Sequence, residues 1–342
     1  MIFRLATLAL FACLPFKTFA VEPFKAFTVN VSAIPFSDFE PANPTKLQFG
    51  RLEFRGGAIL ESDNRSFGGL SGLRVLDNGT SLLAVSDSGY WLSAKIKRDN
   101  FGAIWKIEDA KMSQLWSGAG PRKNPQKYYV DAEGLTFSGD RVLVAFEAIN
   151  TLSSYERNIE TLSMEPTLLD LPKSVDSLSV NKGLEALATA PNTTPFPGAI
   201  IALSERGERR SADFYGWLLN DDGSSYEDID FRIKRRDNFD LTEVDFLPNG
   251  DVLILERRFT LATGVAMRMR RIPSTNVKKN ALLDGEVMIE AALAHRIDNM
   301  EGLSVYKNEK GETILAMISD DNHSLLQKTI YLEFALIDDT QD

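Results

Sequence analysis

Apolar residues in this chain occur in short runs that are bounded by turn residues. The runs at 82–85, 142–146, 252–255 and 314–318 hold four or five apolar residues each and carry no charge. Most of them follow a turn that contains Gly with Asn, Asp or Lys. Uncharged runs of this length are typical of strands buried on both faces, and such turns join strands into hairpins. The pattern predicts an all-β protein without a helix of useful length.

This strand–turn–strand unit occurs five times, at residues 68–89, 131–148, 181–207, 240–258 and 300–322. Each unit opens with a small or acidic cluster and ends its second apolar run at a carboxylate. Intervals of 52 to 62 residues separate the opening residues, which are Ser71, Glu133, Glu185, Glu243 and Glu301. Hairpins repeated at such an interval indicate the blades of a β-propeller.

The segments between the units can supply two further strands to each blade. Weaker alternating patterns occur there, for example at 90–96, 103–107 and 268–272. One clear strand, 329–336, follows the last unit, and another, 47–54, begins the propeller. We expect these two strands to pair in one blade, because this closes the ring and removes the sheet edge. The expected fold is a propeller of four-stranded antiparallel blades, five by this count, or six if two have been merged.

The first 20 residues have the pattern of an export signal. Arg4 precedes an apolar stretch at 5–14, and Thr18-Phe19-Ala20 offers a cleavage site. A lipoprotein-like box at 10–13 is a poorer fit because of Phe11. We therefore expect a periplasmic or secreted protein, divided into a signal peptide (1–20), an N-terminal extension (21–45), one propeller domain (46–336) and a C-terminal tail (337–342).

Charge and cysteine content restrict the partners. Cleavage after Ala20 removes Arg4, Lys17 and Cys13, the only cysteine, so the mature chain has 36 basic and 48 acidic residues and no thiol. Disulfides and thiolate metal sites are then excluded. A net charge of −12 repels nucleic acid and anionic membrane surfaces, and no remaining segment is apolar enough to span a bilayer. We expect a monomer that binds a small molecule.

Each unit has a residue and a carboxylate at equal distances from its turn. Residues in such positions lie opposite each other in a regular hairpin. The pairs are Ser71 with Asp87, Glu133 with Glu147, Glu185 with Glu205, Glu243 with Glu256, and Glu301 with Asp320. If the hairpins are the inner strands of their blades, all these pairs lie around one mouth of the central channel.

Many acids in one confined place must raise their pKa values, pair with cations or bind metal. A hard cation that prefers several oxygen ligands, Ca²⁺, suits them. The candidate metal ligands are Asp87, Glu133, Glu147, Glu185, Glu205, Glu243, Glu256, Glu301 and Asp320. Asp131, Asp298 and Asp321 lie close to them in the sequence. In the alternative interpretation, these carboxylates are structural caps that accept backbone N–H groups from the next blade.

Departures from the repeat suggest where chemistry takes place. The first unit has Ser71 in place of Glu, and the last continues into Asp321-Asn322-His323. We select Glu133, Glu301, Asp320 and His323 as candidate catalytic residues. Basic side chains beside the acids could hold a phosphate or carboxylate group, and these are Lys182, Arg206, Arg257 and Arg258. The chain has no GxSxG elbow, no P-loop and no GxGxxG fingerprint.

The ordered motifs resemble those of the esterase-like phytase family. They read GGLSGL…LAVSDSG, DAEGL…VAFE, NKGLEAL…ALSE, DLTEVDFLPNGDVLILER and DNMEGLSV…ISDDN, and the resemblance covers residues 50–335. It implies an exported bacterial propeller and hydrolysis of phosphoesters or esters. The recurring acids of the family match Asp87, Glu133, Glu147, Glu185, Glu205, Glu256, Glu301 and Asp320.

Three functions remain open from the sequence. The first is Ca²⁺-assisted hydrolysis of phosphoesters at the channel mouth. The second is non-catalytic binding of a ligand or partner at the same place. The third is hydrolysis of lactones or carboxylic esters, also with a metal.

Overall fold

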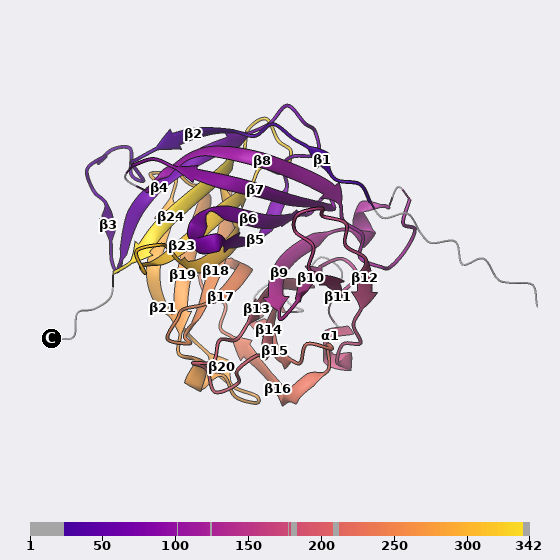
Figure 1. The fold of residues 1–342 in the computed structure, drawn as a ribbon. Helices are drawn as coiled ribbons and strands as arrows, with labels where there is room; N and C mark the ends of the chain where they lie inside the picture. The colour runs from indigo at the N-terminus through magenta and orange to yellow at the C-terminus, as the bar shows by residue number, and fades with distance from the viewer. Residues whose placement is uncertain are drawn as a thin grey trace, which may run out of the picture.

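The structure is a computed structural model that describes residues 24–100, 102–123, 125–176, 178, 183–207 and 212–337. The export signal predicted at 1–20 and most of the tail at 337–342 lie outside the described residues. Five sheets surround a common axis and form a five-bladed propeller, which confirms the predicted fold class and the count of five (Figure 1). The helical elements among the described residues are short: α1 (Lys173–Asp176), η1 (Asp77–Gly79), η2 (Lys127–Tyr129) and η3 (Ser274–Asn276). None of the helices in this part of the chain has the length and apolar character that a membrane span requires.

The first two blades are antiparallel. From the outside inward, the first contains β1 (Phe27–Thr28), β8 (Ile104–Gln114), β7 (Tyr90–Arg98), β6 (Ser81–Ser86) and β5 (Leu70–Leu76). The second contains β12 (Pro166–Leu168), β11 (Thr151–Glu156), β10 (Arg141–Phe146) and β9 (Ala132–Ser138). β1 belongs to the segment that the sequence assigned to an N-terminal extension, and it pairs with the edge of the first blade.

The next two blades follow the same plan. From the inside outward, the third contains β13 (Leu184–Thr189), β14 (Ile200–Ser204), β15 (Phe214–Leu219), β16 (Ser225–Ile233) and β20 (Leu282–Leu283), the last of which pairs in parallel. The fourth contains β17 (Asp240–Phe246), β18 (Val252–Thr260), β19 (Gly264–Ile272) and β21 (Glu286–Ala292).

The fifth blade joins the two ends of the chain. Three C-terminal strands, β22 (Asn299–Lys307), β23 (Thr313–Asp320) and β24 (Thr329–Leu336), continue into the N-terminal strands β4 (Leu52–Glu61) and β2 (Ser32–Phe36). In Figure 1 the yellow β24 lies beside the indigo β4, and Ile330 pairs with Ile59. The predicted closure is therefore confirmed. The N-terminal strand predicted at 47–54 is divided, because Gly50, at φ +62°, turns the chain between β3 (Gln48–Phe49) and β4.

The inner strands β5, β9, β13, β17 and β22 contact one another in that cyclic order. Five apolar clusters fill the spaces between adjacent blades. In one of them, Leu83 and Val85 of β6 pack with Leu135 of β9 and Val142 of β10. Burial on both faces explains why these strands read as uninterrupted apolar runs.

The channel is filled by an arginine below the mouth. Arg74 is 7% exposed, and its guanidinium donates to the carbonyl oxygens of Leu73, Leu187 and Leu303 on three different blades. Its Nη1 lies 3.7 Å from Oε2 of the buried Glu243. The guanidinium of Arg74 thus joins the inner strands of three blades near the axis of the propeller.

Candidate functional site

The closing carboxylates lie at the hairpin ends, as the sequence predicts. The backbone N–H groups of Asp87 and Glu147 donate to the carbonyl oxygens of Gly69 and Asp131 at 2.8 and 3.0 Å. Glu205 makes the equivalent bond to Gly183 at 3.2 Å. In these hairpins, the residue directly opposite the closing carboxylate is therefore not the predicted opening residue. It is the residue two positions before it in the sequence.

A β-bulge in each first strand causes this offset. Pairing shifts by one residue just after Leu70, Ala132, Leu184, Leu241 and Met300. The bulge places Ser71, Glu133, Glu185, Thr242 and Glu301 in equivalent positions. A bulge redirects a side chain at the end of a strand, and here it directs Ser71 and three of the four other side chains into the mouth.

The bulge also explains the Gly that follows Ser71, Glu133 and Glu301. A Cβ on Gly72 would lie 2.8 Å from the carbonyl oxygen of Glu133, and one on Gly134 would lie 2.6 Å from that of Glu185. The neighbouring inner strand approaches so closely that a side chain would collide with its backbone. The Gly after the bulge residue thus allows close contact between neighbouring inner strands at Gly72 and Gly134.

In the fourth blade the predicted pairing of Glu243 with Glu256 is wrong. Leu241 lies opposite Glu256, and Asp240 lies opposite Arg257, so Thr242 takes the bulge position and Arg257 lines the mouth. Thr242 is buried, and its hydroxyl donates to the carbonyl oxygens of Leu255 and Met300 instead of lining the cavity. Glu243 instead lies one residue deeper, 3.7 Å from Arg74, and accepts the N–H of Val244. Glu256 is fully buried inside the blade.

Glu256 is held by two arginines. Its carboxylate accepts bonds from Nε of Arg268 at 3.0 Å and from Nε and Nη2 of Arg270 at 2.8 and 2.7 Å. Both arginines are almost completely buried. Neither Glu243 nor Glu256 lines the mouth cavity. The charge of Glu256 is compensated by the two arginines. Burial raises the pKa of Glu243 well above its usual range, although Arg74 opposes the shift.

The other seven predicted carboxylates line one cavity of about 760 Å³ at the mouth. They are Asp87, Glu133, Glu147, Glu185, Glu205, Glu301 and Asp320, and Asp298 joins them. Among the described residues, Arg257 is the basic side chain in this lining. The geometric basis of the sequence prediction, that separate blades bring acids to a shared opening, is confirmed.

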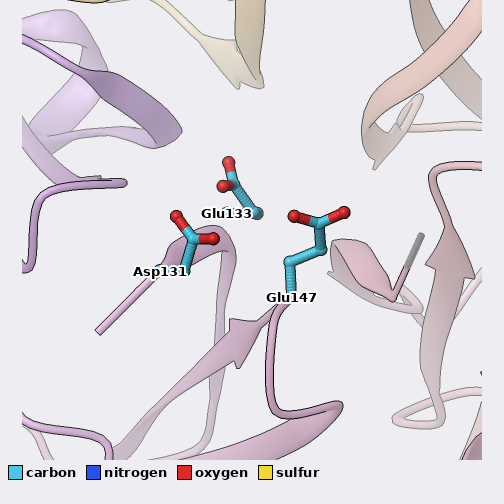
Figure 2. A group of neighbouring side chains, drawn as sticks. All are labelled: Asp131, Glu133 and Glu147. Carbon is cyan, nitrogen blue, oxygen red and sulfur yellow. The ribbon is translucent and has the colours of Figure 1, made fainter. Parts of the chain in front are cut away.

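Three acids of the second blade form the tightest group. Asp131 precedes β9, Glu133 lies at the bulge of β9, and Glu147 follows β10 directly. One carboxylate oxygen from each lies within 4.8 Å of the others, and Figure 2 shows the three groups turned toward a common space. Asp131 was noted in the sequence only as a neighbour. Its position opposite Glu147 becomes visible once the bulge is included.

Burial and mutual repulsion raise the pKa values at the mouth. Burial, with Glu205 and Asp131 nearby, raises the pKa of Glu147 to about 7. Burial raises the pKa of Glu301 to about 8, although Arg257 opposes it. The pKa of Asp320 rises to about 6, from burial and the charges of Asp87 and Asp321.

The remaining mouth acids shift in the same direction. Burial is the largest cause for Glu133 and Glu185, and adjacent carboxylates add to it, so both pKa values lie well above the usual range. The pKa of Glu205 is also raised by burial, against the effect of Arg206 and Arg257. All three shifts show that several carboxylates share a buried place with little compensating charge, which is an environment that a bound cation would stabilise.

Basic side chains compensate only part of the negative charge at the mouth. Arg257 Nε lies 2.7 Å from Oε1 of Glu301, and its Nη2 lies 3.9 Å from Oε1 of Glu205. Lys127, which the sequence analysis did not select, pairs with Asp87 and lies 3.5 Å from Asp131. Lys127 lies in a short helical turn outside the repeated motif.

The other predicted residues lie at or beyond the edge of the mouth. Arg206 pairs with Glu205 at 3.1 Å and with Asp240 at 2.9 Å. Arg258 turns away, with its guanidinium 4.5 Å from the centre of the Phe239 ring. His323 is exposed, and its Nε2 lies 3.4 Å from the hydroxyl of Ser88. Lys182 lies outside the described residues.

The family model described as "Phytase-like: Esterase-like activity of phytase" matches residues 65–323. Among solved structures, the endo-arabinase of Bacteroides thetaiotaomicron VPI-5482 is 14% identical with a TM-score of 0.49, over 81% of this chain and 98% of that one. The glutaminyl cyclase of Myxococcus xanthus is 11% identical with a TM-score of 0.42, over 93% and 100% of the two chains. A search of curated proteins finds no match.

Proposed function

We propose that this chain, which belongs to the phytase-like family, is an exported hydrolase that cleaves phosphoesters at the channel mouth with the help of Ca²⁺. The observation that carries the proposal is the cavity lined by carboxylates from four blades. Burial, with adjacent carboxylates, raises the pKa values of Glu133, Glu147 and Glu185 there. Structural caps would have their oxygens bonded to backbone N–H groups. Here Oδ1 of Asp87 and Oε2 of Glu301 are buried and have no hydrogen-bond partner among the residues that the structure describes.

The donor set fits a hard cation. Asp131, Glu133 and Glu147 offer three carboxylate oxygens within 4.8 Å of one another, and Ca²⁺ prefers oxygen ligands of this kind. We propose that these three residues hold the ion. A bound Ca²⁺ would neutralise phosphate charge and lower the pKa of a water molecule. A phosphate group would otherwise be repelled by the surrounding acids, so the proposal requires strict dependence on the metal.

Other residues of the mouth can bind the substrate and move a proton. Arg257, which the fourth blade contributes, can share its guanidinium between Glu301 and a phosphate oxygen. Glu301 has a pKa of about 8 and remains protonated at neutral pH. Its Oε1 accepts from Asn299 at 2.7 Å, which leaves Oε2 to hold the proton. We assign Glu301 the role of proton donor to the leaving oxygen.

Hydrolysis of carboxylic esters is the second candidate. Among the described residues the lining contains one arginine, which is few for a substrate with several phosphates, and a neutral ester needs none. The same acids and the same ion would serve this reaction.

Chelation and substrate comparison test these proposals. The protein from residue 21 onward is treated with chelator and then assayed with p-nitrophenyl phosphate, inositol hexakisphosphate and p-nitrophenyl acetate, with and without CaCl₂. Phosphate release that appears only with Ca²⁺ supports the main proposal. Turnover of the acetate alone supports the second candidate, and Ca²⁺ binding with no turnover of any ester indicates a non-catalytic binding propeller.

Matched variants locate the ion. We expect Glu133→Gln and Glu147→Gln to weaken Ca²⁺ binding by at least about tenfold, measured by calorimetry, with the fold retained by circular dichroism. Glu286→Gln, on the exposed outer strand β21, is the control and should bind as the parent does. Unchanged affinity in both mouth variants would exclude the three-residue ligand set.

A further inference from the structure

The mouth cavity has two walls of opposite character. Its acidic wall comes mainly from the first three blades, through Asp87, Glu133, Glu147, Glu185 and Glu205. Beyond Arg257, Glu301 and Asp320, the outer part of the cavity on the side of the fourth and fifth blades is lined by apolar residues: Phe259, Val265, Leu293, Ile297 and Leu326. The proposed hydrolytic site therefore continues directly into an apolar surface.

This apolar wall is open to solvent. Phe259 is 61% exposed, Leu293 is 68% exposed and Leu326 is 92% exposed. Leu261 and Leu325, on the same segments, are 98% and 104% exposed. These five include the three most exposed large apolar side chains among the described residues. Contiguous exposed apolar surface marks a binding site more often than single exposed residues do.

The wall depends on a hairpin that extends past the mouth. β18 has nine residues, whereas its counterparts β6 and β10 have six each. Beyond Arg257 it pairs only with β19, so that Phe259 lies opposite Val265. Gly264, at φ +67°, allows Leu293 to pack there, because a Cβ at this position would lie 2.9 Å from the Leu293 methyl carbons. The segment is a built surface attached to one edge of the site.

We propose that the substrate is amphiphilic, with one anionic ester group and an alkyl or aryl group that lies against Phe259, Leu293 and Leu326. This inference rests on the proposed function and specifies its substrate class. The ester group lies over the acids and the cation, and the apolar group covers the wall. A ring bearing many phosphates is disfavoured, because it would direct some phosphates at the apolar wall and others at acids without a cation.

Binding of hydrolysis-resistant ligands tests the proposal without turnover. Methyl-, butyl- and octylphosphonate are titrated into the Ca²⁺-saturated protein by calorimetry, below the micellar concentration. We expect affinity to rise about fourfold for each methylene over the first few carbons. Equal affinity for the three ligands would overturn the proposal.

Exposed residues make suitable variants, since replacing them should not disturb the fold. We expect Phe259→Ser and Leu293→Ser each to weaken octylphosphonate binding about tenfold and to leave methylphosphonate binding unchanged. Leu168→Ser is the control, because this side chain is 47% exposed on β12, away from the mouth. Equal loss for both ligands would indicate damage to the anionic site and would also overturn the proposal.

Two further measurements distinguish this proposal from the proposed function and from membrane binding. Hydrolysis of methyl and octyl phosphate with equal kcat/KM overturns the inference and leaves the proposed function intact. Tighter binding of octylphosphonate with no hydrolysis of any ester refutes the proposed function and retains the apolar contact. The second measurement is sedimentation of the protein with phosphatidylcholine vesicles. If the protein sediments with them, Leu261→Ser does not, and chain length has no effect on phosphonate binding, the apolar surface binds a membrane and the proposal is overturned.

Discussion

Replacing Glu147 with glutamine should stabilise the metal-free protein at alkaline pH. The folded state raises the pKa of this carboxyl from 4.5 to about 7, through burial and the charges of Glu205 and Asp131. A shift of this size corresponds to about 3 kcal/mol of free energy of unfolding. Below pH 4.5 the group is protonated in both states. As the pH rises toward 7, the unfolded chain ionises first, so the folded state loses stability, and above 7 the full penalty remains.

The Glu147→Gln substitution would remove that penalty while keeping the size of the side chain. In chelator at pH 8, we expect the variant to be more stable than the parent by up to about 3 kcal/mol, which corresponds to a rise in Tm of about 5–10 °C. At pH 4.5 the two should be equal. With saturating Ca²⁺ the order should reverse at pH 8, because the parent alone gains the full binding free energy.

Urea unfolding followed by tryptophan fluorescence, between pH 4.5 and 8.5 with and without Ca²⁺, measures all of these differences. The opposing interpretation makes the opposite prediction. If Glu147 is a structural cap, the amide accepts backbone N–H bonds less well than the carboxylate, and the variant is less stable at every pH. A variant that is destabilised at pH 8 in chelator would refute the reasoning about repulsion at the mouth.

Two further substitutions separate the mouth from the interior of the fourth blade. Glu256→Gln should lower the free energy of unfolding by about 3 kcal/mol, because Arg268 and Arg270 remain buried with less compensating charge. Ca²⁺ affinity, measured by calorimetry, should not change. Weaker Ca²⁺ binding would contradict the placement of Glu256 outside the mouth. Arg257→Gln should raise KM for a phosphoester by about tenfold or more. It should also strengthen Ca²⁺ binding, because the substitution removes a positive charge from the mouth. An unchanged KM would show that this guanidinium pairs with Glu301 and does not bind the substrate.

The architecture could be predicted from the sequence because it depends on local signals. Short apolar runs and Gly-containing turns define each hairpin, and the repeat interval defines the ring. The closing strand followed from the same logic, since one strand at each end was left without a partner. The boundary of β4 was less accurate, because the turn at Gly50 depends on a left-handed backbone conformation that its neighbours in the sequence do not reveal.

The predicted opening residues line the mouth cavity in the first, second, third and fifth blades but not in the fourth. Measuring distances from a turn assumes a regular ladder, and a bulge adds one residue to one strand. In the other four blades Ser71, Glu133, Glu185 and Glu301 still reach the mouth. In the fourth, Glu243 follows the bulge position, where the other blades mostly have Gly, and the bulge position itself is taken by the buried Thr242.

The fourth blade is also the one that makes the site chemically asymmetric. A ring with acids in all five blades could bind cations but would offer an anionic substrate no orientation. In this blade no acid takes the bulge position, Arg257 places a cation in the mouth, and the extended hairpin adds the apolar wall directly beyond Arg257. Under the proposed function, orientation of the substrate would therefore depend on this blade, and binding of the ion would depend on the second. Phe259→Ser should then change the preference among esters and leave Ca²⁺ affinity as it is, whereas Glu133→Gln should lower Ca²⁺ affinity and reduce turnover of every ester by a similar factor. Kinetic profiles over the same ester series distinguish the two effects, and a change in ester preference in Glu133→Gln would show that the two blades do not act separately.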